Sequence, residues 1–334
     1  MVGTKVKRGI PYAGKVLVTG DTGFLGHHIV PVIEERWNFA DLVRLGGSKF
    51  FDLTQLGHVS HVFKQIETAH GPIRTVIHLA GMSGGIKDNM SRQATYFYQN
   101  LLMGINMIET CAAPNRVVEK LVMFMGGCSY PNKEGKTTPF KEEEMWDGLP
   151  VDTSIGYSFA KKTLLVAADV YNRQFGLHTM LLLPTNLIGE WDNFDENQSH
   201  VAAGLIRRFV EAREEGYDSV TVWGSGKPVR DFIYAGDVGQ LLPDIIRNCN
   251  EIGPVNISTG VGTSIAELAE MILKATKFKG TIRFDTSKPD GQMHKTLDNS
   301  KLLSILDTDH INFTPLEEAV ERTVEWFEQR VWKK

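Results

Sequence analysis

Along the first 185 residues, short apolar segments alternate with longer segments in which apolar side chains recur at helical spacing. The short segments have the length and β-branched content of buried strands, and they cover residues 15–19, 41–45, 75–79, 120–125 and 178–183. The longer segments predict helices at residues 27–37, 58–66, 96–112 and 157–175. Strands that alternate with helices predict an α/β fold built on a Rossmann-type, doubly wound parallel sheet.

After Pro184 the pattern becomes less regular. Residues 190–198 are polar and aromatic, which indicates a loop. Beyond this loop we expect helices and short strands in mixed order, at residues 200–214, 221–223, 256–258, 264–276, 282–284 and 315–332. This part predicts a smaller, mixed α/β C-terminal domain. We expect residues 1–185 to form the first domain, with returning segments near 230–260, and residues 186–334 to form most of the second.

The composition excludes several classes of protein. With 334 residues, 42% of them hydrophobic, and a net charge of −4, the chain lacks the basic character of a nucleic-acid-binding protein. No apolar run approaches the roughly 20 residues of a membrane helix. The basic first dozen residues lack the apolar core of a signal peptide, and we expect them to form a loose arm. Cys111, Cys128 and Cys249 have no CxxC spacing, so we expect no disulfide framework, no metal site and a cytoplasmic location.

A glycine-rich turn follows the first predicted strand and precedes the first predicted helix. Its sequence, Gly-Asp-Thr-Gly-Phe-Leu-Gly, places glycines at positions 20, 23 and 26 around Phe24 and Leu25. Glycines in this context let a pyrophosphate approach the N-terminus of a helix, where free N–H groups and the helix dipole favour an anion. The turn therefore predicts a dinucleotide site, and the alternative is a tight turn without a ligand.

The end of the second predicted strand indicates which dinucleotide binds. An acid there favours NAD, whereas a cation favours the 2′-phosphate of NADP. The chain has Arg44 and then Lys49 with no acid between them, which favours NADP(H). If the strand ends elsewhere, Arg44 is a solvated surface residue instead. Asp52 and Leu53 are predicted, on weaker grounds, to lie at the adenine end.

Tyr157 and Lys161 form a Tyr-x-x-x-Lys pair at the start of a predicted helix. One helical turn separates them, so both side chains lie on one face. We expect the Lys161 ammonium to lower the pKa of the Tyr157 phenol, so that the phenol exchanges a proton with a sugar oxygen near neutral pH. The alternative is an ordinary surface helix.

Together these motifs resemble the extended short-chain dehydrogenase/reductases and, more narrowly, the GDP-L-fucose synthases, which are GDP-4-keto-6-deoxymannose 3,5-epimerase/4-reductases. The resemblance covers about residues 15–330. Beyond the glycine turn and the Tyr-x-x-x-Lys pair, it rests on residues 76–80 (VIHLA), 83–86 (SGGI), 128–131 (CSYP), 184–189 (PTNLIG), 192–194 (DNF), 199–201 (SHV), 222–228 (VWGSGKP) and 284–291 (FDTSKPDG).

The resemblance implies a chemical role for four residues. Cys128 matches the base and His200 the acid that epimerise C3 and C5, where a neighbouring 4-keto group makes the protons acidic. NADPH then delivers a hydride to C4 while Tyr157, supported by Lys161, protonates the oxygen. Taken alone, Cys128 would be read as a buried apolar residue and His200 as a surface residue of a helix.

The same resemblance implies the binding residues and the partners. Further cofactor contacts are expected from Leu79, Ala80, Gly81, Pro184, Asn186 and Leu187. Contacts with a GDP-linked keto sugar are expected from Gly127, Ser129, Asn186, Arg208, Trp223, Arg230 and Lys295. For the last four, the alternatives are surface charges and a core tryptophan. The helices at residues 96–112 and 157–175 predict a homodimer, unless they only cover the sheet.

Two positions depart from the family pattern. Gly126 stands where the family has its catalytic serine, and loss of one oxyanion donor costs about 3–4 kcal/mol. A water or Ser129 could replace the hydroxyl, or the substrate is a bulkier keto sugar. At Gly189-Glu190-Trp191 the family has Gly-Pro-His or Gly-Pro-Asn, so we expect Glu190 and Trp191 to reshape the sugar pocket. The alternative functions are a single-function reductase or epimerase and a silent NADP-binding protein.

Overall fold

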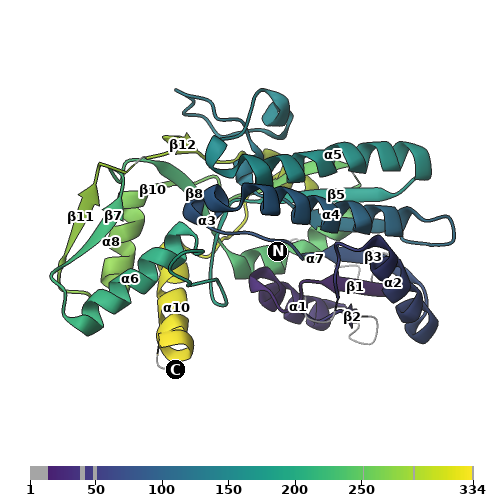
Figure 1. Ribbon diagram of the computed structural model, residues 1–334, viewed down its shortest axis with the longest axis horizontal. Coiled ribbons are helices and arrows are strands. Elements are labelled where there is room, and N and C mark those ends of the chain that lie inside the picture. Colours follow the sequence, from purple (N-terminus) through teal and green to yellow (C-terminus); the bar gives the residue numbers. More distant parts are fainter. Residues whose placement is uncertain (1–13, 38–41, 48–50, 251, 289, 333–334) are drawn as a thin grey trace, which may run out of the picture.

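The computed structural model describes residues 14–37, 42–47, 51–250, 252–288 and 290–332 (Figure 1). The expected N-terminal arm and Lys49 lie outside these residues. Six strands form one sheet in which every neighbouring pair is parallel. In spatial order they are β2 (Leu42–Arg44), β1 (Lys15–Thr19), β3 (Ile73–His78), β4 (Lys120–Phe124), β5 (His178–Pro184) and β9 (Gly253–Ile257). The predicted doubly wound sheet is confirmed.

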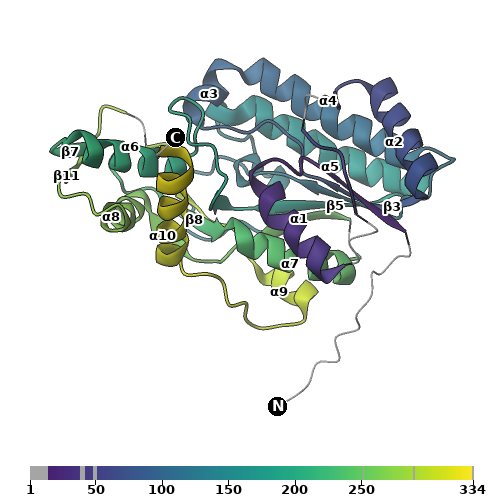
Figure 2. The ribbon, with the colours of Figure 1, turned by 90° about the horizontal axis from the view of Figure 1, so that it is seen from below.

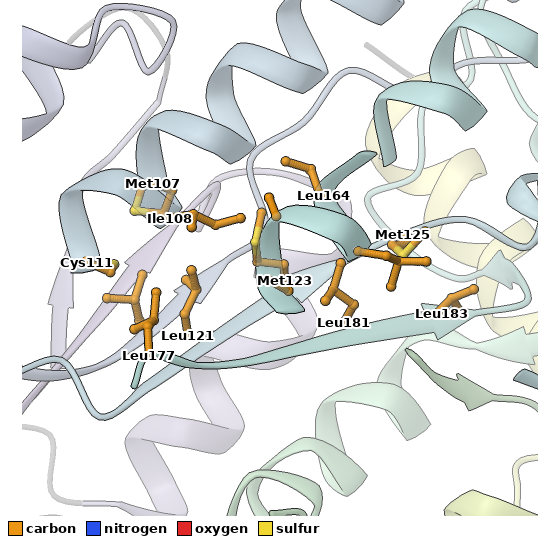
Figure 3. Packing of buried hydrophobic residues seen from close by; sticks show 14 of the residues in the cluster. Met107, Ile108, Cys111, Leu121, Met123, Met125, Leu164, Leu177, Leu181 and Leu183 are labelled. Atoms are coloured by element: carbon orange, nitrogen blue, oxygen red, sulfur yellow. The ribbon is translucent and has the colours of Figure 1, made fainter. Parts of the chain in front are cut away.

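Helices cover both faces of this sheet (Figure 2). One face carries α1 (Phe24–Arg36), α7 (Ala235–Asn248) and α9 (Ser300–Leu306); the other carries α2 (Leu56–His70), α4 (Gln93–Ala112) and α5 (Ile155–Phe175). Because strand side chains alternate between faces, Leu121 and Met123 pack under α4, while Val122 packs under α1 and α7. Figure 3 shows the α4 side, where Met107 and Ile108 lie over β4 and β5.

The strand order places a ligand site at the carboxyl ends of β1 and β3. From β1 the chain moves outward to β2 and then returns to the other side of β1 as β3. Open parallel sheets bind ligands at such a reversal of strand order. The glycine turn and residues 79–81 are these two loops.

The C-terminal part forms a second, mixed layer at one end of the sheet (Figure 1). Its strands are β6 (Asn186–Ile188), β7 (Ser219–Trp223), β8 (Val229–Tyr234), β10 (Gly262–Ser264), β11 (Thr281–Asp285) and β12 (His294–Lys295). Its helices are α6 (Val201–Glu215), α8 (Ile265–Ala275) and α10 (Leu316–Phe327), which continues as a π-helical turn over Glu328–Trp332. They enclose a core of their own around Phe209, Phe278 and Phe327.

Several elements were not predicted from the sequence. They include α7, β8, the short helix α3 (Ile86–Ser91) and the 3₁₀ turns η2 (Gly127–Ser129), η3 (Glu142–Trp146) and η4 (Asp152–Ser154). Among the described residues, none of the helices combines the length and the apolar character that crossing a membrane requires.

Candidate active site

The glycine turn brings the loops after β1 and β3 into direct contact. Gly20 has φ = +73°, and a β-carbon at this position would lie 2.6 Å from the amide nitrogen of Ala80. A β-carbon at Gly26 would lie 2.4 Å from the carbonyl oxygen of Gly20. Only hydrogen fits at either position, so the two loops and the start of α1 pack closely at the carboxyl edge of the sheet.

Helix α1 begins without a side-chain cap. Gly23 is its N-cap residue, and in the described part of the chain no side chain accepts from the first-turn N–H groups. A β-carbon at Gly23 would meet only the carbonyl oxygen of Gly20, at 3.2 Å. The uncapped N–H groups fit the diphosphate of a dinucleotide.

Arg44 ends β2 beside the glycine turn. Its Nε donates to Asp21 Oδ2 at 3.1 Å, and Nη1 lies 3.7 Å from Glu34 Oε1. The side chain is still 47% exposed, so part of the guanidinium is open to a ligand. Asp52 lies in the next loop, where Thr54 donates two hydrogen bonds that lower the pKa of the carboxyl group. Asp52 and Leu53 line a small apolar cavity with Leu45, Phe51, His58, Val59, Val62 and Phe63.

Tyr157 and Lys161 lie in the first turns of α5, with Lys161 Nζ 5.7 Å from the centre of the Tyr157 ring. Lys161 is buried, and loss of hydration lowers its pKa to about 8, against a smaller raising effect of Cys128. A β-carbon at Gly81 would lie 3.5 Å from Nζ, so the amine faces the loop after β3. The lysine thus lies beside the loop after β3, at the carboxyl edge of the sheet.

The expected lowering of the Tyr157 pKa is wrong for the structure as it stands. Burial, reinforced by the neighbouring Cys128 and Tyr96, raises the pKa of the phenol. The physical reason is burial, which removes water from the phenol and disfavours its charged form. The phenol is therefore protonated at neutral pH and can donate a proton.

Gly126 and Cys128 lie directly against Tyr157. A β-carbon at Gly126 would lie 3.3 Å from the Tyr157 hydroxyl oxygen and 3.4 Å from Cys128 Sγ. The 3₁₀ turn η2 produces this arrangement, and Ser158 Oγ fixes it by donating to the Cys128 carbonyl oxygen at 3.1 Å. The phenol and the thiol therefore border a single position, the one where the family's serine would project.

His200 is the N-cap residue of α6, and Asp192 lies beside it. The imidazole is 47% exposed, with Nδ1 3.9 Å from Asp192 Oδ1. Loss of hydration lowers the His200 pKa, but the nearby Asp192 carboxylate outweighs this effect, so the pKa is raised overall. A raised pKa keeps the ring protonated closer to neutral pH, as a proton donor requires.

The expected nucleotide-binding residues form two groups. Arg230 and Lys295 are paired in register between β8 and β12. Burial lowers the pKa of Lys295 to about 8, while Cys128 raises it and Arg230 lowers it further. In the second group, Arg208 donates to the Thr221 carbonyl oxygen at 2.6 Å, and Trp223, two residues along β7, is 56% exposed.

The remaining expected site residues lie at different depths. The Asn186 side chain is exposed and donates to the Asp231 carbonyl oxygen at 2.7 Å. Pro184 ends β5 and is buried, and Leu187 is partly buried in β6. Gly127 has Leu297 as its nearest side chain, at 3.5 Å from a β-carbon built there. Ser129 is fully buried, and its Oγ has no hydrogen-bond partner among the described residues.

Glu190 and Trp191 face α1 and α10. Trp191 has φ = +70° and stacks on His27 of α1, with ring centres 4.0 Å apart. Glu190 accepts a hydrogen bond from the Tyr234 hydroxyl at 2.8 Å. Both line a cleft of about 510 Å³ with His28, Tyr234, Arg322, Glu325, Trp326, Gln329 and Arg330. None of the residues expected to contact the sugar lines this cleft, and a role of Glu190 and Trp191 in shaping the sugar pocket stays a prediction.

Two neighbours of the site were missed in the sequence. Tyr96 of α4 lies edge-on to Tyr157, with ring centres 6.4 Å apart, and its hydroxyl donates to Asp88 at 2.5 Å. Asp192 pairs with His200. Asp192 belongs to the Asp-Asn-Phe motif, from which its place in the site could have been predicted, whereas no motif in the sequence singles out Tyr96.

Comparisons with known proteins agree with this geometry. The NAD dependent epimerase/dehydratase family matches residues 16–258. The GDP-L-fucose synthase of Dictyostelium discoideum is 34% identical over 93% of this chain and 94% of that protein. A probable GDP-L-fucose synthase of Drosophila melanogaster is 35% identical, over 94% and 97%. A GDP-L-fucose synthetase from Naegleria fowleri, solved with NADP bound, has a TM-score of 0.83 and 29% identity, over 95% of this chain and 94% of that one.

Proposed function

The chain belongs to the NAD dependent epimerase/dehydratase family, in its GDP-L-fucose synthase group, and from this premise we propose that it is an NADPH-dependent 3,5-epimerase/4-reductase of a GDP-4-keto-6-deoxyhexose. One observation carries the proposal: the Tyr157 hydroxyl and the Cys128 thiol border the same position next to Gly126. A sugar ring held there meets a proton donor for its keto oxygen and a base for its carbon-bound protons.

The cofactor site is built from the loops at the carboxyl ends of β1, β2 and β3. The uncapped N-terminus of α1 suits the diphosphate, and Arg44 suits the 2′-phosphate of NADP. The small apolar cavity beside Asp52 and Leu53 suits the adenine. At the other end we assign contacts to Leu79, Ala80, Gly81, Pro184, Asn186 and Leu187. When bound, NADPH supplies the hydride.

In the reduction, Tyr157 gives its proton to the C4 oxygen of the sugar. Burial keeps the phenol protonated until that step. The phenolate left behind is stabilised by Lys161, whose amine lies in the same buried region. Gly126 supplies no hydroxyl group, so one donor to the developing oxyanion is missing, which costs about 3–4 kcal/mol relative to an enzyme that has it.

In the epimerisation, Cys128 removes a proton from carbon and His200 returns one to the opposite face. The electron pair of the broken C–H bond moves to the 4-keto oxygen, which Tyr157 also faces. Asp192 supports His200 as the acid because its charge favours the protonated ring. One pocket therefore serves both reactions, since both place charge on the same oxygen.

The guanosine diphosphate end is assigned to Arg208, Trp223, Arg230 and Lys295. Arginine suits bidentate contacts with phosphate, and the exposed Trp223 ring offers an apolar surface to a base. We assign Gly127 and Asn186 to the sugar. Ser129, with its fully buried side chain, shapes the turn that carries Cys128 rather than touching the ligand. Accordingly, the part before residue 186 mainly binds cofactor and the part after it mainly binds the GDP-sugar.

We also propose a homodimer and a cytoplasmic location. Large apolar side chains remain exposed on α4 and α5, namely Phe97, Tyr98, Val166, Val170 and Phe175. Two neighbouring helices with such a face are suited to pack on the same pair in a second copy. The three free cysteines and the use of NADPH suit a reducing compartment.

The test is incubation of the purified protein with GDP-4-keto-6-deoxymannose in D₂O, with and without NADPH. We expect deuterium at C3 and C5 in both cases and NADPH consumption in the second. Deuterium uptake without NADPH consumption would leave an epimerase, and consumption without uptake would leave a C4 reductase. Binding of NADPH with neither reaction would leave a silent protein.

A further inference from the structure

We propose that Gly85 is a positioning residue for His200, because the absence of a side chain at position 85 lets the turn at residues 83–86 dock on the backbone directly before the imidazole. This inference rests on the proposed function, in which His200 returns a proton to the sugar ring. It adds a residue to the reaction that touches neither the substrate nor the cofactor.

The dock is a backbone contact between distant parts of the chain. The Gly85 N–H donates to the Gln198 carbonyl oxygen at 2.8 Å. A β-carbon at Gly85 would lie 2.2 Å from the carbonyl oxygen of Ser199, which belongs to the peptide bond joining Ser199 to His200. The backbone of Gly85 is extended, with φ = −65°, so alanine is conformationally allowed there. Glycine is therefore required at position 85 only because the two backbones lie so close together, and not because of its backbone angles. Any side chain at this position would displace the backbone that precedes His200.

The docking turn is itself held in place. Asn89 Nδ2 donates to the carbonyl oxygens of Gly84 and Gly85, at 2.6 and 3.1 Å. A second attachment links the two segments, since Lys87 Nζ donates to Asn197 Oδ1 at 2.5 Å. These contacts hold the turn in place, so the segment before His200 packs against a fixed surface.

The same turn links His200, the proposed acid, to the part of the site around Tyr157 that takes part in hydride transfer. Asp88, in the helix that follows the docking turn, accepts a hydrogen bond from Tyr96, whose ring packs edge-on against Tyr157. His200 thus takes its place from the same framework that holds Tyr157. Asp192, the other neighbour of the imidazole, is fixed separately by the Asn193 N–H at 2.7 Å.

The chemistry makes this placement sensitive. The distance of 3.9 Å between His200 Nδ1 and Asp192 Oδ1 is already long for an ion pair, so a small shift of the backbone separates them. A displacement of about 1 Å at a catalytic group can cost 10²-fold in rate. If His200 moves while Cys128 stays, the Cys128 thiolate still removes the proton from carbon and becomes a thiol. The thiol exchanges its proton with D₂O, the electron pair returns from the oxygen, and carbon takes a deuteron back from the same thiol, so exchange continues without inversion.

The experiment compares wild type with Gly85→Ala, using Gly57→Ala as control, since a β-carbon at Gly57 meets no atom of the described residues within 4 Å. Each protein receives GDP-4-keto-6-deoxymannose in D₂O, and NMR separates deuterium uptake from inversion at C3 and C5. The hydride step is measured alone, by oxidation of GDP-L-fucose with NADP⁺. For Gly85→Ala we expect inversion to fall about 10- to 100-fold, with KM, deuterium uptake and GDP-L-fucose oxidation within about twofold. Equal loss of all reactions, or unchanged inversion, overturns the inference.

Two further measurements keep the inference testable if that variant misfolds or the substrate is wrong. Lys87→Met removes only the exposed attachment to Asn197, and we expect a two- to fivefold loss of inversion alone; no change overturns the inference. If wild type converts no 4-keto sugar, the proposed function fails instead. The dock is then judged by the ¹³Cε1 chemical shift of His200, assigned with His200→Gln, which must differ between wild type and Gly85→Ala but not Gly57→Ala.

Discussion

The backbone of Gly126 lies against the hydroxyl group of Tyr157, so closely that a β-carbon at position 126 would be 3.3 Å from the phenolic oxygen. A side chain there would also reach Cys128 Sγ, at 3.4 Å. The family's serine would thus stand among the reacting groups. Its absence is a local change in how charge on the sugar oxygen is stabilised, and it leaves the positions of the acid and the base intact.

The contribution of the missing hydroxyl can be measured by two substitutions of nearly equal size. Gly126→Ala and Gly126→Ser both press a β-carbon on Tyr157, so the steric cost is shared. We expect the serine variant to reduce the 4-keto sugar about 10- to 100-fold faster than the alanine variant, because it adds an oxyanion donor. Single-turnover NADPH consumption makes the comparison, and equal rates would show that the hydroxyl has no role at this site.

The Asp192–His200 pair predicts a pH dependence. Partial loss of hydration lowers the pKa of His200, whereas Asp192 raises it and outweighs that effect. In Asp192→Asn only the lowering effect remains, so less of the ring is protonated near pH 8 and inversion at C3 and C5 should fall about tenfold. Acidification towards pH 6 should restore part of the rate. GDP-L-fucose oxidation by NADP⁺, which does not use His200, serves as the control, and a parallel loss there would contradict the assignment.

Elements that depend on local patterns were predictable from the sequence. Strand β1 and the glycine turn appear as an apolar run followed by glycines at fixed spacing, and the Tyr157–Lys161 pair follows from helical geometry. Helix α7 was missed because Gly236, Gly239 and Pro243 interrupt its pattern. A β-carbon at Gly239 would lie 2.5 Å from the His28 carbonyl oxygen, so this glycine serves the close packing of α7 on α1.

The parts of the site that depend on long-range contacts were not predictable. The contact of Gly85 with Ser199 joins residues more than 100 positions apart, and no spacing rule relates them. The direction of the Tyr157 pKa shift was also missed, because burial, which the sequence does not reveal, outweighs the nearby ammonium. The sequence shows the departure at Glu190 and Trp191, but only the structure shows that these residues lie against α1 and α10.

Arg44 predicts the preference for NADPH over NADH. Its guanidinium is held by Asp21 and Glu34 beside the glycine turn. Arg44→Ala removes a charge-assisted contact worth about 1.5–3 kcal/mol and leaves two carboxylates to repel a phosphate. We expect KM for NADPH to rise about 10- to 100-fold while KM for NADH changes less than about threefold. Arg44→Lys should be intermediate, and equal effects on both cofactors would place the 2′-phosphate elsewhere.

The exposed face of α4 and α5 predicts self-association. Val166, about half exposed on α5, lies in the proposed interface. We expect wild type to sediment as a dimer at micromolar concentration and Val166→Lys as a monomer, because charges in an apolar interface are left unpaired. Val261→Lys changes a similarly exposed valine outside these helices and should leave the dimer intact. A wild-type monomer would refute the interface.

Lys161 predicts a conflict between stability and activity. Its amine is buried, and the folded state lowers its pKa to about 8, below the value of about 10.4 in an unfolded chain. Below pH 8 the buried amine is charged, and its burial lowers the free energy of unfolding by about 3 kcal/mol, because one pKa unit corresponds to about 1.36 kcal/mol. This cost declines as the pH rises from 8 and is absent above about pH 10.4, where the amine is neutral in both states.

Lys161→Met removes that cost together with the support of the phenolate. We expect the variant to lose most of its reductase activity, yet to be more stable than wild type at pH 7 by up to about 3 kcal/mol, with the difference shrinking towards pH 10. Urea denaturation at the two pH values measures this, and Lys64→Met, on the exposed face of α2, controls for loss of a lysine. A destabilised variant at pH 7 would mean that the ammonium is stabilised in the folded protein, and the buried amine would then belong to a permanent ion pair rather than to the reaction.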